Sequence, residues 1–231
     1  MSGLFILFEG PNASGKSSQI NQLASNLSSL GREVVITREP GGDPEAEAIR
    51  QKIFTMKKAG ELSPLDEMNL FFQSRKIWID RVVRPALESG HDVIADRCYP
   101  STLVYQGILG GIPRAIIEGK IQEVCGNTLP DMIILLNFIG EEGVEELIRR
   151  IQTDTVYTEI NPYRELDPNQ YIKICEGYAT VAELGKQQGE KWLCLDATST
   201  RELLSATIFQ EVSKELQLSD RGIPPQGFSK G

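Results

Sequence analysis

The sequence is poor in residues that bind metals or form disulfides: it contains one histidine, His91, and four cysteines, at positions 98, 125, 175 and 194. No two cysteines form a C-x-x-C metal pair, and their spacing does not suggest a secreted disulfide framework. We therefore expect reduced thiols and a cytoplasmic location. His91 precedes an apolar run and is interpreted as a strand-start residue rather than a catalyst.

An excess of positive charge is also missing, since 24 Lys and Arg stand against 32 Asp and Glu, for a net charge of −8. This balance argues against binding of a nucleic acid polymer, but not against a small anionic substrate held by a few arginines. No apolar run approaches the roughly 20 residues that span a bilayer. The N-terminal MSGLFILFEGP has no basic n-region and is interpreted as a first strand, so no membrane association is expected.

What is present is an alternation of short apolar runs with longer amphipathic ones. Apolar runs of strand length predict buried strands at 4–8, 33–36, 93–95, 132–136 and 192–195. Helical patterns occupy 16–30, 44–59, 64–89, 113–125, 141–152, 169–187 and 200–216, and Pro85 should kink the third of these. The alternation predicts a three-layer α/β fold with a five-stranded parallel sheet flanked by helices. We expect one domain over residues 1–217 with a lid at about 153–168, and a flexible tail over 218–231.

The stretch FEGPNASGKSSQ at 8–19 follows the first predicted strand and leads into the first predicted helix. It fits G-x-x-x-x-G-K-[ST], a loop whose backbone amides and helix N-terminus hold phosphates. Lys16 would hold the β- and γ-phosphates, and Ser17 would bind Mg²⁺. The pattern predicts a nucleoside triphosphate site without specifying the reaction. Its nucleotide-binding residues are Gly10, Pro11, Asn12, Ala13, Ser14, Gly15, Lys16, Ser17 and Ser18.

Two further strands end in charged residues that reach the same edge of a parallel sheet. HDVIADR at 91–97 places Asp96 where it could hold Mg²⁺, directly or through water, and Arg97 where it could reach an acceptor phosphate. TREPGG at 37–42 adds Arg38 over the same edge. Each motif taken alone also fits a surface pair at a strand end or a plain turn.

A helical stretch, LFFQSR at 70–75, carries an aromatic residue and a cation on one face. Phe71 and Arg75 are four residues apart, which suits stacking and edge-bonding of a base, whereas Phe72 points elsewhere and is assigned to the core. Core packing with a snorkelling arginine is the alternative. In STLVYQG at 101–107, hydroxyl and amide groups could line the same pocket, although its composition is that of an ordinary helix.

Together the motifs FEGPNASGKSSQ, TREPGG, LFFQSR and DRCYPSTLVYQG resemble the thymidylate kinase family in order and approximate spacing. Members of that family transfer a phosphate from ATP to dTMP. PDMIILL at 130–136 and the turn at 196–198 also look like that family. The resemblance, strong over 3–136, implies a P-loop kinase fold, Mg²⁺ with ATP as co-substrate, and dTMP as acceptor. It also implies a homodimer, because members often associate through helices around 64–89.

The resemblance implies a role for each matching residue. Arg38 and Arg97 would clamp the acceptor phosphate, Phe71 would stack on thymine and Arg75 would donate to the edge of the base. Ser101 or Thr102 would place a hydroxyl near the base, Tyr105 would crowd the 2′ position of the sugar, and Gln106 would lie in the same pocket. Pro40 would follow a cis peptide bond and line the substrate site.

The chain departs from the family pattern at the loop and the lid. Asn12 stands where an acidic residue usually contacts the 3′-hydroxyl, and Ala13 stands where some members carry an arginine for the transition state. Members without that arginine usually have a basic lid. The lid of this chain, IQTDTVYTEINPYRELDP, contains a single arginine, Arg164. Arg149 and Arg150 lie just before it.

An arginine on the migrating phosphoryl group can be worth about 10³ or more in rate, so one of these arginines should act there. We select Arg149 and Arg164, together with Lys16 and Arg97, as the catalytic cations; for Arg150 the alternative is a place on a solvated helix face. The predicted reaction is MgATP + dTMP to MgADP + dTDP. The alternatives are a kinase for another deoxynucleoside monophosphate and a weakly active nucleotide-binding regulator.

Overall fold

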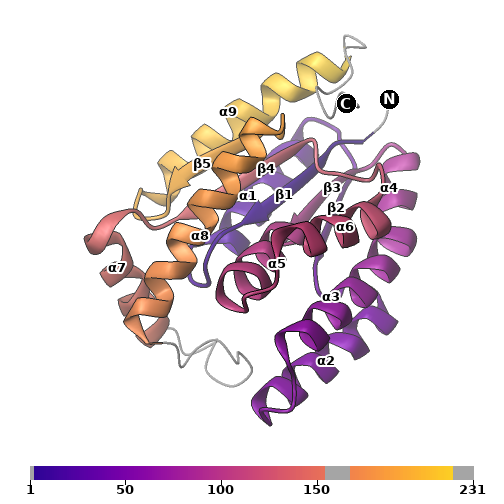
Figure 1. Ribbon diagram of the computed structural model, residues 1–231. Coiled ribbons are helices and arrows are strands. Elements are labelled where there is room, and N and C mark those ends of the chain that lie inside the picture. The colour runs from indigo at the N-terminus through magenta and orange to yellow at the C-terminus, as the bar shows by residue number, and fades with distance from the viewer. Residues whose placement is uncertain (1–2, 154–166, 221–231) are drawn as a thin grey trace.

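The computed structural model describes residues 3–153 and 167–220, and at its centre is a sheet of five parallel strands (Figure 1). The strand order across the sheet is β2-β3-β1-β4-β5. The predicted α/β class and all five predicted strands are confirmed. The strands are β1 (Phe5–Glu9), β2 (Val34–Arg38), β3 (Asp92–Asp96), β4 (Met132–Asn137) and β5 (Trp192–Asp196).

The register of the sheet brings the charged strand ends together. β1 and β2 both pair with β3, so that Phe8 and Arg38 each lie opposite Asp96. Every residue of β1 and β4 is buried, as expected for central strands of a sheet covered on both faces. Because all strands run the same way, the carboxyl ends of β1, β2 and β3 form one edge, where sheets of this class bind ligands.

Helices cover both faces of this sheet and complete a three-layer arrangement (Figure 1). Helix α1 packs against α9, while α8 packs against β4, β5 and the segment η2. The helical segments described are α1 (Lys16–Ser29), α2 (Pro44–Lys58), α3 (Pro64–Trp78), η1 (Ile79–Val83), α4 (Arg84–Glu88), α5 (Tyr99–Thr102), η2 (Leu103–Leu109), α6 (Arg114–Cys125), α7 (Gly140–Thr153), α8 (Pro168–Gln187) and α9 (Arg201–Asp220).

The predicted helix at 64–89 is divided by a π-helical turn, η1. The backbone N–H of Arg84 donates to the carbonyl of Ile79, five residues earlier instead of four. Pro85 follows at once and lacks an N–H, so its ring disfavours a regular α-helical turn just before it. The irregularity expected near Pro85 is therefore present as a wide turn on its N-terminal side.

Two other boundaries differ from the sequence predictions. Residues 99–109 form α5 and η2, a helical segment absent from the predicted helices, although its composition had suggested one. Helix α9 continues to Asp220, so the first three residues expected in a flexible tail are helical. The rest of that tail and most of the expected lid lie outside the described residues. None of the helices in the described ranges is long and apolar enough to cross a membrane.

Candidate active site

The loop between β1 and α1 has the conformation that its glycines allow. Gly15 caps α1 at φ 92°, and Gly10 has φ 131°. A Cβ on Gly10 would lie 2.0 Å from the carbonyl oxygen of Leu136 in β4, so no other residue fits there without displacing backbone. The loop is thus held close against β4, with the N-terminus of α1 facing the sheet edge.

Lys16 is folded back onto the loop that carries it. Its ammonium donates to the carbonyl oxygens of Pro11 at 2.8 Å and Gly10 at 3.1 Å, and the residue is 5% exposed. Burial and, second to it, the positive charge of Arg97 lower the pKa of Lys16 to about 7, against the opposing effects of Asp96 and Glu9. The amine therefore lies in a site with too little negative charge to neutralise it.

Ser17 and Asp96, the two expected Mg²⁺ ligands, line one cleft of about 530 Å³ together with Arg38. The Asp96 Oδ1 atom is buried and has no hydrogen-bond partner among the described residues. Those residues contain no group of three or more His, Cys, Asp or Glu side chains placed to hold a metal ion among themselves. One carboxylate and one hydroxyl fit Mg²⁺, which takes oxygen ligands and usually completes its shell with water and substrate phosphates. Arg38 is held beside them by Glu47, whose Oε2 accepts its Nη2 at 3.0 Å.

Arg97 contacts three of the other predicted substrate-site residues: Asn12, Ser101 and Tyr105. Its Nη2 donates to Asn12 Oδ1 at 2.7 Å and its Nη1 to Ser101 Oγ at 3.2 Å. The guanidinium carbon lies 5.9 Å from the centre of the Tyr105 ring. Nη1 also donates to the hydroxyl of Tyr178, at 2.5 Å.

Tyr178 and Glu9 are two residues of this site that the sequence reasoning missed. Glu9 is fully buried at the end of β1 and accepts hydrogen bonds from the Cys98 N–H at 2.8 Å and from Ser101 Oγ at 2.7 Å. Burial raises the pKa of Glu9, and Arg97 is the largest opposing influence. The sequence did carry a signal for Glu9, because a carboxylate there directly follows the apolar run of the first strand. Tyr178 lies on α8, 81 residues from Arg97, and carries no local signal.

Arg75 is completely buried and joins two other parts of the site. Its Nη2 donates to Glu39 Oε2 at 3.0 Å and to Thr102 Oγ1 at 2.8 Å. Its guanidinium lies over the ring of Phe72 at 4.6 Å, so the buried aromatic partner of Arg75 is Phe72. Phe71 is only half-buried. Nε and Nη1 of Arg75 have no hydrogen-bond partner in the described part of the chain.

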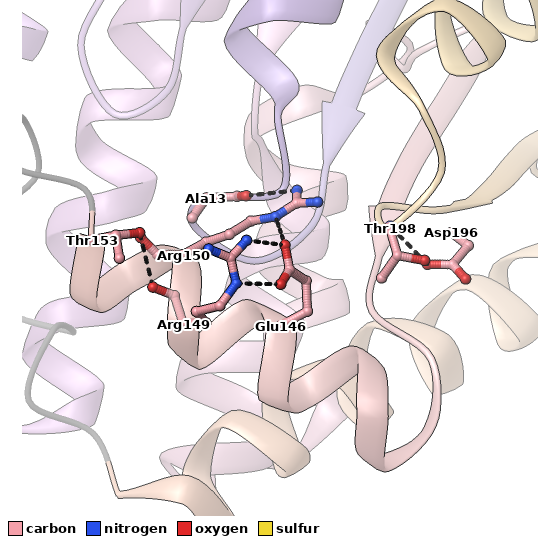
Figure 2. A network of polar contacts seen from close by, with 7 residues as sticks. All are labelled: Ala13, Glu146, Arg149, Arg150, Thr153, Asp196 and Thr198. Atoms are coloured by element: carbon pink, nitrogen blue, oxygen red, sulfur yellow. Dashed lines mark hydrogen bonds and ion pairs between the residues drawn. The ribbon is translucent and has the colours of Figure 1, made fainter.

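The remaining predicted pocket residues lie on the segments that carry these contacts. The peptide bond between Glu39 and Pro40 is cis, as the resemblance implied. Gln106 is buried in η2, 2% exposed, on the segment that also carries Tyr105. On β5, Asp196 Oδ1 accepts from the N–H and the hydroxyl of Thr198, which fixes the turn after the strand (Figure 2).

The two arginines at the end of α7 differ in where they point, and it is Arg150, not the selected Arg149, that faces the phosphate loop (Figure 2). Arg150 lies over the ring of Phe138 at 5.3 Å, and its Nη1 is 3.4 Å from the carbonyl oxygen of Ala13. It also lines a cleft of about 390 Å³ with loop residues 13–18. Both nitrogen contacts of Arg149 are to Glu146, at 2.6 and 2.8 Å, and its side chain is 64% exposed.

This difference follows from helix geometry, because adjacent residues of an α-helix point about 100° apart. Glu146 accepts from both arginines, and their hydrogen bonds, with Arg149 first, lower the pKa of Glu146 to about 2. Arg164, the other selected arginine, lies outside the described residues. Of the two arginines that the structure describes here, it is Arg150 that lies against the phosphate loop.

Comparison with known proteins identifies relatives that span almost the whole chain. The family model described as thymidylate kinase matches residues 8–208. A thymidylate kinase of Caulobacter vibrioides is 33% identical over 94% of this chain and 99% of its own, and one of Deinococcus radiodurans is 34% identical over 92% and 97%. The crystal structure of thymidylate kinase from Ehrlichia chaffeensis is similar with a TM-score of 0.67 and 25% identity, covering 94% of this chain and 99% of the other.

Proposed function

This chain belongs to the thymidylate kinase family and catalyses ATP-dependent phosphoryl transfer to dTMP, and from that premise we propose which residues perform each part of the transfer. The observation that carries the proposal is the meeting of two cationic groups at one sheet edge. Lys16 on the phosphate loop serves the donor, and Arg97 at the end of β3 serves the acceptor.

ATP binds with its phosphates along the loop residues 10–18, whose amides and helix N-terminus face them. On binding, the ammonium of Lys16 exchanges the carbonyl oxygens of Gly10 and Pro11 for phosphate oxygens. Ser17 and Asp96 would hold Mg²⁺, which would neutralise charge on the transferring group.

Arg97 and Arg38 bind the phosphate of dTMP and align it with the γ-phosphoryl group. Their planar guanidinium groups match the oxygens of a phosphate and can donate two hydrogen bonds to it. The chain needs no general base, because the acceptor phosphate is already an ionised nucleophile. Positioning and charge neutralisation are therefore the contributions required of the protein.

The nucleoside of dTMP lies beside the segments around Arg75. We assign base stacking to Phe71, the base edge to Arg75 with Thr102 or Ser101, and the exclusion of a 2′-hydroxyl to Tyr105. The two unpartnered nitrogens of Arg75 support this assignment, since a buried guanidinium gains from an acceptor supplied by substrate. Asn12, Pro40 and Gln106 line the same substrate site.

Arg150 replaces Arg149 in this proposal as the cation nearest the transferring group. Its contact with Ala13 places it at the loop position where some members of the family carry an arginine. Arg164 stays a prediction, as do the lid at 153–168 and the single domain over 1–217. In this proposal α7 supplies the cation that acts on the transferring phosphoryl group.

We also propose a homodimer in the cytoplasm. Three large apolar side chains are exposed on neighbouring segments: Leu65 of α3, Ile108 of η2 and Ile116 of α6. A second copy of the chain would cover them. Three of the four cysteines, Cys98, Cys125 and Cys175, are buried free thiols, which suits a reducing compartment. Light scattering of the wild type and of Leu65→Asp tests the dimer.

The test of the residue assignment is a coupled assay of ADP release with MgATP and a panel of dTMP, dUMP, dGMP, dCMP, dAMP and UMP. We expect rapid turnover on dTMP that is lost in Arg97→Ala. Turnover of the variant at the wild-type rate would remove Arg97 from the acceptor site. Faster turnover on another monophosphate would keep the mechanism and change the preferred substrate.

A further inference from the structure

Arg97 has an unusual backbone conformation that its neighbours must enforce. At φ 73° it is, with Ala13, one of two non-glycine residues at positive φ in the described ranges. A non-glycine residue adopts this region at a cost in free energy and persists there only where surrounding contacts determine it. Two residues on opposite sides of Arg97, Glu9 and Tyr178, provide those contacts.

On one side, Glu9 of β1 fixes the segment that follows Arg97. One carboxylate oxygen accepts the backbone N–H of Cys98, the next residue, and the other accepts the hydroxyl of Ser101. Glu9 is fully buried, so both hydrogen bonds are protected from competition by water.

On the other side, Tyr178 of α8 meets the guanidinium itself. Its hydroxyl lies 2.5 Å from Nη1 of Arg97 and 2.8 Å from Ser101 Oγ, and its ring packs edge-on against Tyr105 with centroids 6.3 Å apart. Tyr178 is 0% exposed. Its contacts therefore join α8 to the residue at the end of β3.

The direction of the hydrogen bonds in this cluster depends on the charge of Glu9, which the neighbouring Arg97 favours. An ionised Glu9 only accepts, so Ser101 then donates its hydrogen to Glu9, and the hydroxyl of Tyr105 is a further partner of Tyr178 and Arg97. Ser101 Oγ then accepts from Tyr178, and both hydroxyl oxygens keep lone pairs for Nη1 of Arg97. The carboxylate thus determines that Arg97 faces two acceptors.

We propose that Glu9 and Tyr178 are positioning residues that act through Ser101 to hold the Arg97 guanidinium where the acceptor phosphate binds. This inference rests on the proposed role of Arg97. Neither residue needs to touch substrate: Glu9 sets the direction of the hydrogen bonds, and Tyr178 supplies the oxygen closest to the guanidinium. Their removal should impair the use of dTMP and spare the binding of ATP.

The experiment uses two nearly isosteric variants, Glu9→Gln and Tyr178→Phe. The glutamine can still accept from the Cys98 N–H through its oxygen, but then its amide nitrogen faces Ser101 and reverses that hydroxyl. Matched controls are Glu67→Gln, a buried glutamate that accepts from Lys57, and Tyr99→Phe, a buried tyrosine that donates to Glu190. Each control alters one partly buried polar contact that does not involve Arg97.

We expect KM for dTMP to rise at least about tenfold in both variants, with KM for ATP within about twofold of the wild type. The controls should leave both constants unchanged, and thermal melting identifies any variant that fails to fold. In an Arg97→Lys background, the additional effect of Tyr178→Phe on KM for dTMP should disappear, because the residue acts through Arg97.

An unchanged KM for dTMP in both variants would overturn the inference, as would equal effects of Tyr178→Phe in the two backgrounds. A rise in KM for dTMP that the control variants share would also overturn the inference, because it would show a general effect of losing a polar contact. The result for Arg97→Lys alone distinguishes a failure of the proposed role of Arg97 from a failure of the positioning inference. If it leaves KM for dTMP unaltered, the proposed role of Arg97 fails. If it raises KM while Glu9→Gln and Tyr178→Phe do not, only the positioning inference fails.

Discussion

Binding of ATP should draw about one proton from solution onto Lys16 at pH 8. The pKa of Lys16 in the nucleotide-free protein is about 7, because burial and the charge of Arg97 outweigh the attraction of Asp96. At pH 8 roughly one tenth of the molecules then carry the ammonium form, by the one-unit difference between pH and pKa. The phosphates of ATP place several negative charges beside the amine and restore its usual affinity for a proton.

The expected uptake is therefore about 0.9 proton at pH 8 and about 0.1 at pH 6, where the free protein is already mostly protonated. Isothermal titration calorimetry of ATP binding, without acceptor, in buffers of different ionisation enthalpy measures it as the slope of the observed enthalpy. The variant Lys16→Met should abolish the slope at pH 8. A binding enthalpy independent of buffer at pH 8, or an unchanged slope in Lys16→Met, would refute the reasoning.

The same depressed pKa has a consequence for stability. Between about pH 7 and the unfolded value near 10.4, the unfolded chain binds a proton at Lys16 that the folded protein does not. The contribution of Lys16 to the free energy of unfolding therefore increases as pH rises through this window. This contribution is lost as pH falls toward 7. The free energy of unfolding of the Lys16→Met variant should lack this part of the pH dependence, and urea titrations of both proteins across the window measure it.

Three other predictions concern single residues. Arg150→Ala should lower kcat about a thousandfold whereas Arg149→Ala should stay within about twofold, measured by steady-state ADP release; the reverse order would restore Arg149 as the catalytic arginine. Glu39→Gln should lower the free energy of unfolding in urea by about 3 kcal/mol, because it leaves the buried Arg75 charge without its partner, and an unchanged midpoint would contradict this. Asp96→Asn should raise the Mg²⁺ concentration for half-maximal rate at least about tenfold, and an unaltered Mg²⁺ titration would argue against a ligand role.

The sheet and the phosphate loop could be predicted from the sequence because their signals are local. Each strand is an apolar run of strand length, and the loop pattern lies between a strand and a helix. The strand-end residues Arg38, Asp96 and Arg97 were found for a related reason. Parallel strands bring their carboxyl ends to one edge, so their proximity follows once the fold class is known.

What could not be predicted depends on contacts between residues far apart in the chain or on how a helix is rotated about its own axis. Tyr178 contacts Arg97 from a helix 81 residues away, which no local pattern encodes. Arg149 and Arg150 are neighbours of the same type, and only the orientation of α7 decides which one faces Ala13. The π-helical turn at 79–83 involves a shift of one hydrogen bond, to which composition is insensitive.

The pairing of β1 with β3 places Phe8 opposite Asp96, and the activity of the protein depends on this register. Successive side chains of a strand point to opposite faces, so a slip of one residue would turn Glu9 away from Cys98 and Ser101. A misaligned chain would thus lose the orientation of Arg97 altogether instead of keeping a fraction of it. Specific activity per molecule should consequently report correctly paired protein, and a refolded sample that has regained helix content without activity would be expected to contain slipped strands.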